Sequence, residues 1–239
     1  MRLVNFFTSA RKAVVLTVVA LAAVTSIASA ANRSPQVSFI SGNLQAYLTT
    51  NDGGINVLTD QLNSPLFQSN VSGVTDFTLM VKIGGNASTD VIGVYNGGTN
   101  TVPGTLYSLF PTFATNGWFA TCVFKASGAL YVYLYDNSNP NVFQGLTAYS
   151  GVDRNHIGFY VQNTVGTFYS EDILNSGSAP QALTYAGTGA NAGDIWECFQ
   201  DSPYAANSST FQNVVLLLQS VAATPTSAKS WGSVKAGYR

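Results

Sequence analysis

Two neighbouring segments alternate strictly between the two sides of an extended chain, and this alternation constrains the fold more than any other feature of the sequence. Residues 118–125 read W-F-A-T-C-V-F-K, and a period of two places on one face Trp118, Ala120, Cys122 and Phe124. Residues 130–135 read L-Y-V-Y-L-Y, with the aliphatic side chains on one face and Tyr131, Tyr133 and Tyr135 on the other. Because Ser127 and Gly128 supply a turn between the segments, the sequence predicts a β-hairpin.

The remainder of the chain repeats this pattern of short strands and turns. Strand candidates lie at residues 77–83, 156–162 and 214–218, and the last is apolar on both faces, which is typical of a central strand in a layered structure. Residues 43–49 predict one or two helical turns, and the sequence shows no long amphipathic helix. We therefore expect an all-β fold, a β-sandwich or jelly roll, formed by a single domain over residues 31–221.

The first thirty residues have the pattern of a secretory signal peptide. Three basic residues lie within the first twelve positions, an apolar stretch follows at 13–27, and the small residues Ala-Ser-Ala occupy 28–30. A membrane-spanning helix needs about 18 to 20 apolar residues, and this stretch is shorter. We expect cleavage after Ala30 and a mature protein that is secreted or at the cell surface, without a transmembrane segment.

Charge is scarce in this chain, and its scarcity excludes one class of partner. Charged residues make up 9% of the sequence, against about 25% in an average globular protein. The signal peptide contains three of the ten basic residues, so the mature chain carries a net charge of −4. Nucleic acid, which requires a basic surface, is not expected as a partner, whereas low net charge favours self-association.

The three tyrosines of residues 130–135 form the candidate binding surface. Aromatic side chains stack on sugars and on partner proteins, and contiguous exposed aromatics are uncommon on a surface without a role. Tyr131, Tyr133 and Tyr135 would then bind surface glycans. The alternative is that a second layer of the protein covers them, because tyrosine is a normal strand residue.

The two cysteines leave a choice between a disulfide and two free thiols. Cys122 and Cys198 each lie on a predicted strand and share its inward face with a tryptophan, and an exported chain permits a disulfide. The sequence favours a Cys122–Cys198 bridge that links two strands through the core. Two separate buried thiols are the alternative, because cysteine is often buried even when it is free.

Groups for catalysis are few. The only histidine, His156, begins a predicted strand, where a hydrogen-bonded structural role is more usual than that of a general base. Paired acids occur at Glu171 with Asp172 and at Glu197 with Asp201, but adjacent acids in loops are generally solvated. No zinc spacing and no glycine-rich phosphate loop is present. We expect a protein that is not an enzyme.

Several segments resemble a family of secreted bacterial β-sandwich domains of unknown function. They are FTLMVKIGGNAST (77–89), TLYSLFP (105–111), GWFA (117–120), GVDRNHIGFY (151–160), FYSEDILN (168–175), WECFQD (196–201) and FQNVV (211–215). The family reads roughly W-x-x-F-E-D and then D-[FY]-N-D-x-V in its last third, and it is often found in exported, surface and adhesin-like proteins. The resemblance implies the same fold and an extracellular, adhesion-type role.

The resemblance also implies a calcium site in the loop between the two motifs. Here Asp201 remains, but Gln200, Thr210 and Asn213 stand where the family has acidic residues. Ca²⁺ prefers charged oxygen ligands, so these replacements weaken the expected affinity. We therefore expect no cofactor. Calcium, at Asp201, Gln200 and Asn213, is the one candidate to test.

The chain ends in a segment of different composition. Residues 222–239 read as a linker followed by W-G-S-V-K-A-G-Y-R, which is similar to the sorting tails of exported bacterial proteins. A frayed terminus is the alternative. Together these features predict a non-catalytic extracellular or cell-surface domain of structural or adhesion type, with self-association or surface glycans as its interactions. The alternative function is a carbohydrate-binding module that uses an exposed aromatic strand face.

Overall fold

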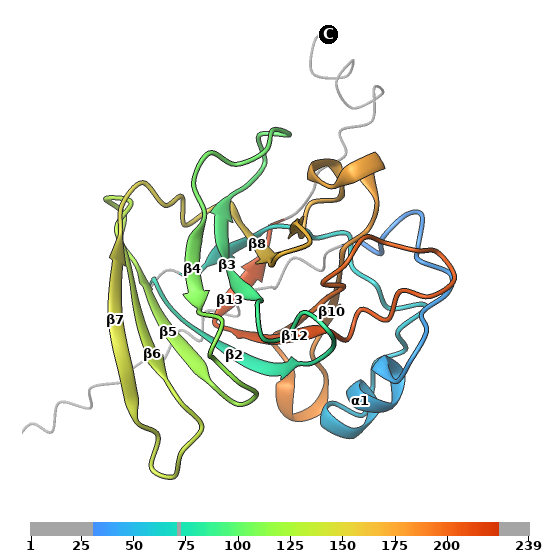
Figure 1. Cartoon of the computed structure of the whole chain (residues 1–239), viewed down its shortest axis with the longest axis horizontal. Helices are drawn as coiled ribbons and strands as arrows, with labels where there is room; N and C mark the ends of the chain where they lie inside the picture. The colour runs from blue at the N-terminus through green and yellow to red at the C-terminus, as the bar shows by residue number, and fades with distance from the viewer. Residues whose placement is uncertain (1–30, 71–72, 225–239) are drawn as a thin grey trace, which may run out of the picture.

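A computed structural model describes residues 31–70 and 73–224, and these residues form an almost entirely β structure. Thirteen strands build two antiparallel sheets that pack face to face, so the predicted all-β sandwich is confirmed (Figure 1). The predicted signal peptide and most of the C-terminal tail lie outside the described residues. The last strand, β13 (Val221–Ala223), runs two residues past the predicted domain boundary at 221.

The larger sheet has seven strands, in the order β10 (Ala182–Ala186), β11 (Ile195–Phe199), β12 (Val214–Gln219), β2 (Val74–Lys82), β5 (Phe119–Phe124), β6 (Leu130–Tyr135) and β7 (Phe143–Tyr149). The smaller sheet has the order β13, β1 (Phe67–Ser69), β8 (Ile157–Gln162), β3 (Val91–Asn96) and β4 (Tyr107–Phe110), with β9 (Thr167–Tyr169) also pairing with β8. Strands from both halves of the chain meet at the centre of the larger sheet, where β12 pairs with β2.

The main core lies between the two sheets. Alternate residues of each strand point into it, as their period of two predicts. Phe77 of β2 meets Phe159 of β8 edge to face, with ring centroids 5.2 Å apart. The predicted hairpin is confirmed as β5 and β6, in a register that pairs Cys122 with Val132, and both side chains are buried in this core.

A second core covers part of the outer face of the larger sheet. The helix α1 (Leu44–Asn51), close to the helical turns predicted at 43–49, buries Leu44 and Leu48 against the outer side of β10–β12. Trp196 of β11 lies beneath it, and its indole Nε1 donates a hydrogen bond to Asp52 Oδ2 over 2.7 Å. Because β11 and β12 are buried on both sides, almost all of their residues are apolar.

The predicted disulfide between Cys122 and Cys198 is wrong: both are buried free thiols. Cys122 points into the core between the sheets, whereas Cys198 points to the opposite face of the larger sheet, under α1. Their strands are also separated by β12 and β2, a gap of about 14 Å from three strand spacings. A disulfide requires Cα atoms within about 7 Å, so this geometry cannot be bridged.

One further test concerns membranes. Within residues 31–70 and 73–224, no helix combines the length and the apolar character needed to cross a bilayer.

Candidate functional site

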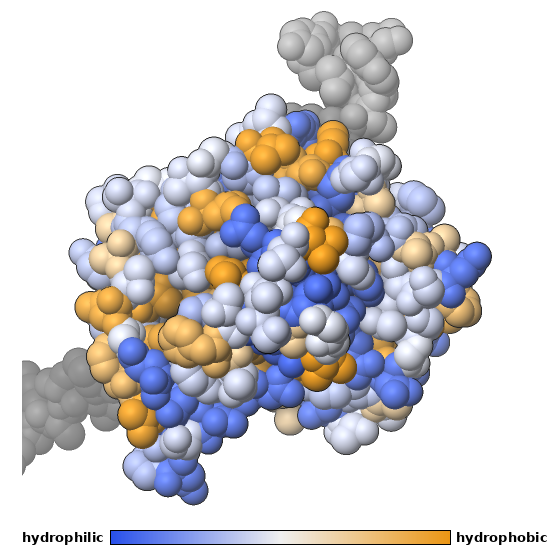
Figure 2. All heavy atoms as spheres, in the orientation of Figure 1, coloured by the Kyte–Doolittle hydropathy of each residue, from blue (hydrophilic) through white to orange (hydrophobic). Residues whose placement is uncertain are grey.

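The outer face of the larger sheet is open over β5, β6 and β7. The burial of β6 alternates along the strand: its aliphatic residues are buried, and Tyr131, Tyr133 and Tyr135 are half-buried on the outer side. No layer of described residues covers the tyrosines, in contrast to the region under α1. Figure 2 shows hydrophobic residues gathered at the left margin of the molecule, where Figure 1 draws β7.

Strand register places three rows of side chains across this open surface, which we call the aromatic face. The rows are Thr78–Phe119–Tyr135–Phe143, Asp76–Thr121–Tyr133–Leu146 and Val74–Val123–Tyr131–Ala148. Phe143 and Leu146 of the outermost strand are each 51% exposed. The surface is therefore apolar toward β7 and gains a carboxylate and hydroxyls toward β2.

The rings of the aromatic face differ in what they offer to a ligand. Phe119 and Tyr135 stack on each other at 4.8 Å with an interplanar angle of 9°, and Phe143 tilts against Tyr135 at 5.5 Å. Each of these rings covers part of a neighbouring ring, so that part is not accessible to a ligand. Among the described residues no aromatic ring packs on Tyr133, whose cross-strand neighbours are Thr121 and Leu146. Within the same residues, Tyr131 likewise has no aromatic ring packed on it, so Tyr131 and Tyr133 both have a ring face accessible for stacking.

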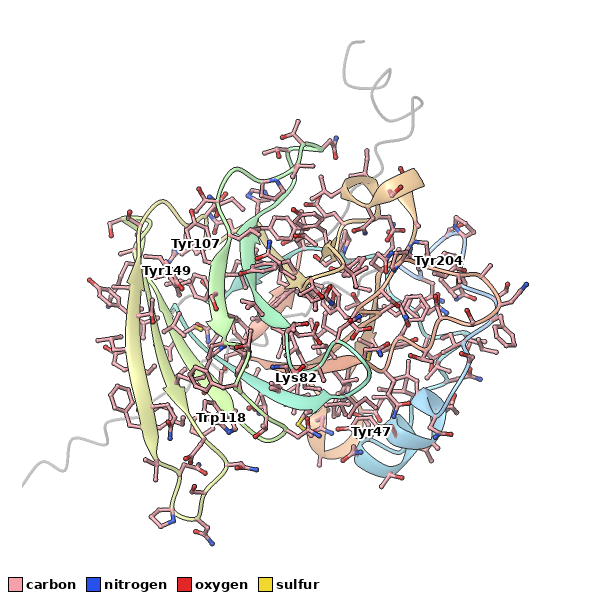
Figure 3. The ribbon with its side chains drawn as sticks, in the orientation of Figure 1. Tyr47, Lys82, Tyr107, Trp118, Tyr149 and Tyr204 are labelled. Atoms are coloured by element: carbon pink, nitrogen blue, oxygen red, sulfur yellow. The ribbon has the colours of Figure 1, made fainter. Side chains whose placement is uncertain are left out.

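The tyrosine hydroxyls show the same difference between structural and surface positions. The rings of Tyr107 and Tyr149 pack together on the inner side of the sheets (Figure 3). The Tyr107 hydroxyl donates to the carbonyl oxygen of Gly151, and the Tyr149 hydroxyl donates to that of Ser108. Buried Tyr185 likewise donates to Val57 O over 3.0 Å. Within the described part of the chain, the hydroxyls of the three β6 tyrosines make no such bond. They remain available to a ligand.

The hairpin between β6 and β7 is held by Asp136. Its Oδ1 accepts hydrogen bonds from the backbone N–H groups of Ser138 and Val142, and its Oδ2 accepts one from Gln144. These bonds, led by the one from Val142, lower the pKa of Asp136. The acid therefore fixes the register of β7, and with it the position of Phe143 and Leu146.

A different part of the molecule contains the residues predicted for calcium. Gln200 does not point toward an ion position: its Oε1 accepts hydrogen bonds from Thr210 N at 2.8 Å and Phe211 N at 3.3 Å, and its Nε2 donates to Ser202. The Oδ1 of Asn213 accepts from Thr210 Oγ1. Gln200 thus organises the loop between β11 and β12 and offers no free oxygen to a cation.

Asp201 has a partner acid that sequence reasoning missed. Asp90, which precedes β3, is fully buried, and Asp201 is 2% exposed. Burial, with the charge of nearby Asp90, raises the pKa of Asp201 to about 6. Burial also raises the pKa of Asp90. Asp90 stands 111 positions before Asp201 in a glycine-containing turn, so no spacing pattern could reveal the pair.

The other candidate acids have structural partners. His156 Nδ1 lies 2.8 Å from Asp153 Oδ2 at an exposed position. Arg33 donates to Asp172, and the backbone N–H of Gly98 donates to Glu171. These contacts occupy the residues on loops, and Arg33 and Asp172 also line a pocket together with residues 34–38 and Tyr204.

Glu197 is a second fully buried acid, like Asp90. It is fully buried on β11, and Thr184 donates a hydrogen bond to its Oε2 over 2.7 Å. Burial raises the pKa of Glu197 to about 8, so the carboxyl is protonated at neutral pH. The charged groups near Glu197 are Arg33 and Asp172, whereas the acid near Asp201 is Asp90.

No group of three or more His, Cys, Asp or Glu side chains that could hold a metal occurs within residues 31–70 and 73–224. Comparisons with protein-family models, with curated proteins and with solved structures find no match to this chain. The proposals that follow therefore rest on the chain's own residues.

Proposed function

We propose that this protein is a non-catalytic extracellular domain of adhesion type that binds carbohydrate on its aromatic face. The observation that carries the proposal is the open outer side of β5–β7, on which Tyr131, Tyr133 and Tyr135 stand half-exposed with their hydroxyls unused. An exposed aromatic surface on a soluble protein is expected to have a partner.

Carbohydrate fits the chemistry of this surface because a sugar ring has both an apolar and a polar side. The C–H groups of a pyranose stack on an aromatic ring, and its hydroxyls seek hydrogen bonds at the ring edge. Tyr133, at the centre of the stripe, offers one such ring face. Beside it, Thr121 donates to Asp76 Oδ1, and Asp76 Oδ2 has no hydrogen-bond partner among the described residues. That oxygen is an acceptor placed next to the stacking ring.

The shape of the tyrosine stripe favours an extended ligand. Tyr131 and Tyr135 are four residues apart on one strand, which spans about 13 Å at about 3.3 Å per residue. This length exceeds a single sugar ring. The low charge of the chain suits a neutral ligand, because the rows of the aromatic face contain one acid and no basic residue.

Self-association is the second candidate, and a separate observation favours it. β7 is an edge strand of sequence F-Q-G-L-T-A-Y, without a charged residue, so one side of its backbone is open to pairing. Natural edge strands are usually protected by charges, proline or a covering element. A second copy that paired along β7 would also cover Phe143 and Leu146.

Glycan binding is tested with a glycan array, followed by affinity measurement on any oligosaccharide that binds. Tyr133→Ala removes the central ring of the stripe, and we expect binding to weaken about fivefold, because stacking contributes about 1 kcal/mol and 1.4 kcal/mol is tenfold. The matched control is Tyr204→Ala, which removes a half-buried tyrosine of the loop at 200–213, away from the aromatic face. Equal affinity of the two variants rejects Tyr133 as the binding residue.

The two candidates are separated by the molar mass in solution. Sedimentation of the wild-type chain and of Leu146→Lys, which puts a charge on β7, shows whether the edge strand pairs. Glycan binding predicts a monomer in both. A wild-type dimer that Leu146→Lys dissociates, together with an empty array, would establish self-association instead.

A further inference from the structure

Two buried carboxylates from different sheets meet beside the turn that connects β2 to β3. Asp90 stands immediately before β3 of the smaller sheet, and Asp201 follows β11 of the larger sheet by two residues. Asn163 Nδ2 donates to Asp90 Oδ1 and to the backbone oxygen of Asp201, both at 2.8 Å. A single amide group therefore holds the two acids close together.

Each acid leaves one oxygen without a partner. Asp90 is 0% and Asp201 2% exposed, and the Oδ2 atom of each has no hydrogen bond. An ionised carboxylate in this condition is costly, because burial removes its hydration and nothing replaces it. Native proteins rarely leave such atoms unsatisfied without an ion, a water molecule or a proton.

The nearest cationic side chain does not supply the missing contacts. Lys82 lies near Asp90, but its Nζ donates to the backbone oxygens of Thr112 at 2.6 Å and Ala114 at 3.1 Å (Figure 3). Its charge offsets one carboxylate at most. Two buried acids against one ammonium group leave a net charge of −1 at this place when both acids are ionised.

A glycine brings the turn after β2 close to Asp201. A Cβ atom at Gly84 would lie 2.6 Å from Asn213 Nδ2 and 3.7 Å from Asp201 Oδ2. Gly84 also has a φ of +104°, which side-chain-bearing residues rarely adopt. The turn can therefore pass close to the free oxygen of Asp201, so that its backbone groups lie near that oxygen.

We propose that Asp90 and Asp201 bind one Ca²⁺ ion that links the two sheets. The groups at this place offer oxygen and no sulfur or imidazole, which selects a hard cation. Ca²⁺ takes six to eight oxygen ligands in irregular geometry, whereas Mg²⁺ demands a near-ideal octahedron. The amide oxygen of Asn86, nearby backbone carbonyls and water are the groups that would complete the shell.

This ligand set differs from the one that the sequence predicts. Asp201 remains in it, whereas Gln200 and Asn213 are excluded because their amide oxygens accept hydrogen bonds within the loop. Asp90 supplies the second charge. The site therefore keeps two carboxylates although its loop has lost three acidic positions. The loop between β11 and β12 contributes only one of these carboxylates, Asp201.

The test is calorimetric titration of the full chain, freed of metal by chelation, with CaCl₂ or MgCl₂ at pH 7.5. We expect one Ca²⁺ per chain, weaker binding of Mg²⁺, and a melting temperature about 5–10 °C higher when Ca²⁺ exceeds Kd a hundredfold. Asp90→Asn and Asp201→Asn should each weaken Ca²⁺ binding at least tenfold. Asp60→Asn, which neutralises an exposed acid elsewhere, is the matched control and should bind Ca²⁺ like the wild type.

The alternative to a bound Ca²⁺ ion is that Asp90 and Asp201 share a proton. The same experiment distinguishes the two. If the pair only holds a proton, the melting temperature is equal in Ca²⁺ and in chelator, and lowering the pH from 7.5 to 5 raises stability in the wild type but less in Asp90→Asn. That outcome, or Ca²⁺ binding that both variants leave unchanged, overturns the proposal. Because Asp90 and Asp201 lie off the aromatic face, the result is independent of glycan binding.

Discussion

The outer face of the larger sheet is covered over β10–β12 and open over β5–β7, although both halves belong to one continuous sheet. On the covered half, α1 and the segments around it bury Trp196, Cys198 and Leu217. On the open half, the corresponding positions hold Thr121, Tyr133 and Leu146. The boundary runs along β2, whose Thr78 lies between Leu217 and Phe119.

The difference shows how one sheet can serve two purposes. Strands that are buried on both sides need apolar residues at almost every position, as in I-W-E-C-F and V-V-L-L-L-Q. The open strands alternate, and their outer positions carry tyrosines, which tolerate water at the hydroxyl and retain an apolar ring. The layer formed by α1 and its neighbouring segments stabilises the first half. The second half has no such layer among the described residues, so its outer face stays accessible to a ligand.

Two leucine truncations test this contrast most directly. Leu48→Ala removes a fully buried side chain of α1, and we expect it to lower the free energy of unfolding by about 2–5 kcal/mol because it leaves a cavity in the second core. Leu146→Ala makes the same chemical change on the open half, where the side chain is 51% exposed, and should cost at most about 0.5 kcal/mol. Urea denaturation of both variants measures the difference. Similar costs would show that the open half is covered in solution.

The pH dependence of stability tests the burial of β11. The folded state raises the pKa of Glu197 from 4.5 to about 8, so the contribution of its neutral form is complete below about 4.5 and is lost as the pH rises through 8. Glu197→Gln stays neutral and should lessen the fall in unfolding free energy over this range, by up to about 1.4 kcal/mol per pH unit. Denaturation at pH 5, 6.5 and 8 gives both slopes. Parallel slopes in wild type and variant would mean that Glu197 does not titrate there.

The smallest effect is expected from reduction. Because Cys122 and Cys198 are unpaired and lie on opposite faces, a reducing agent should leave the melting temperature unchanged, and a thiol reagent should label two cysteines after unfolding. Under native conditions Cys198 should react before Cys122, since only α1 and its neighbouring segments cover it. A native mass two hydrogens lower than the reduced mass would contradict this arrangement.

The alternation of single strands was predictable from the sequence. The residues at 118–135 assign both faces of β5 and β6 correctly, because one face is buried and the other is not. The continuous apolar run at 214–218 likewise identifies a strand buried on both sides. Turn glycines mark the ends of these strands.

The pairing of distant faces was not predictable in the same way. Cys122 and Cys198 each share a face with a tryptophan, and both faces are indeed buried. When a strand has two buried faces, its pattern does not say which of two cores each face enters. The disulfide prediction failed on this point, since β11 turns Trp196 and Cys198 toward α1.

The acid pair illustrates a second limit. Asp201 ends the segment WECFQD (196–201), which carries the family resemblance. Asp90 lies in the turn after β2, directly before β3, and no motif marks it. The two are brought together by the packing of the smaller sheet on the larger one, through Asn163 at the end of β8. Such contacts depend on tertiary structure and cannot be predicted from the spacing of residues in the sequence.

The pairing of β2 with β12 at the centre of the larger sheet also determines when this protein can fold. The two strands, residues 74–82 and 214–219, are far apart in the sequence, and such contacts form slowly because a long loop must close first. A chain that emerges N-terminus first can pair β2 with β5, but the other edge of β2 has no partner until β12 follows. The sheet is therefore completed only when β12 has emerged, and until then β2 and β5–β7 form a stack of strands with both faces bare.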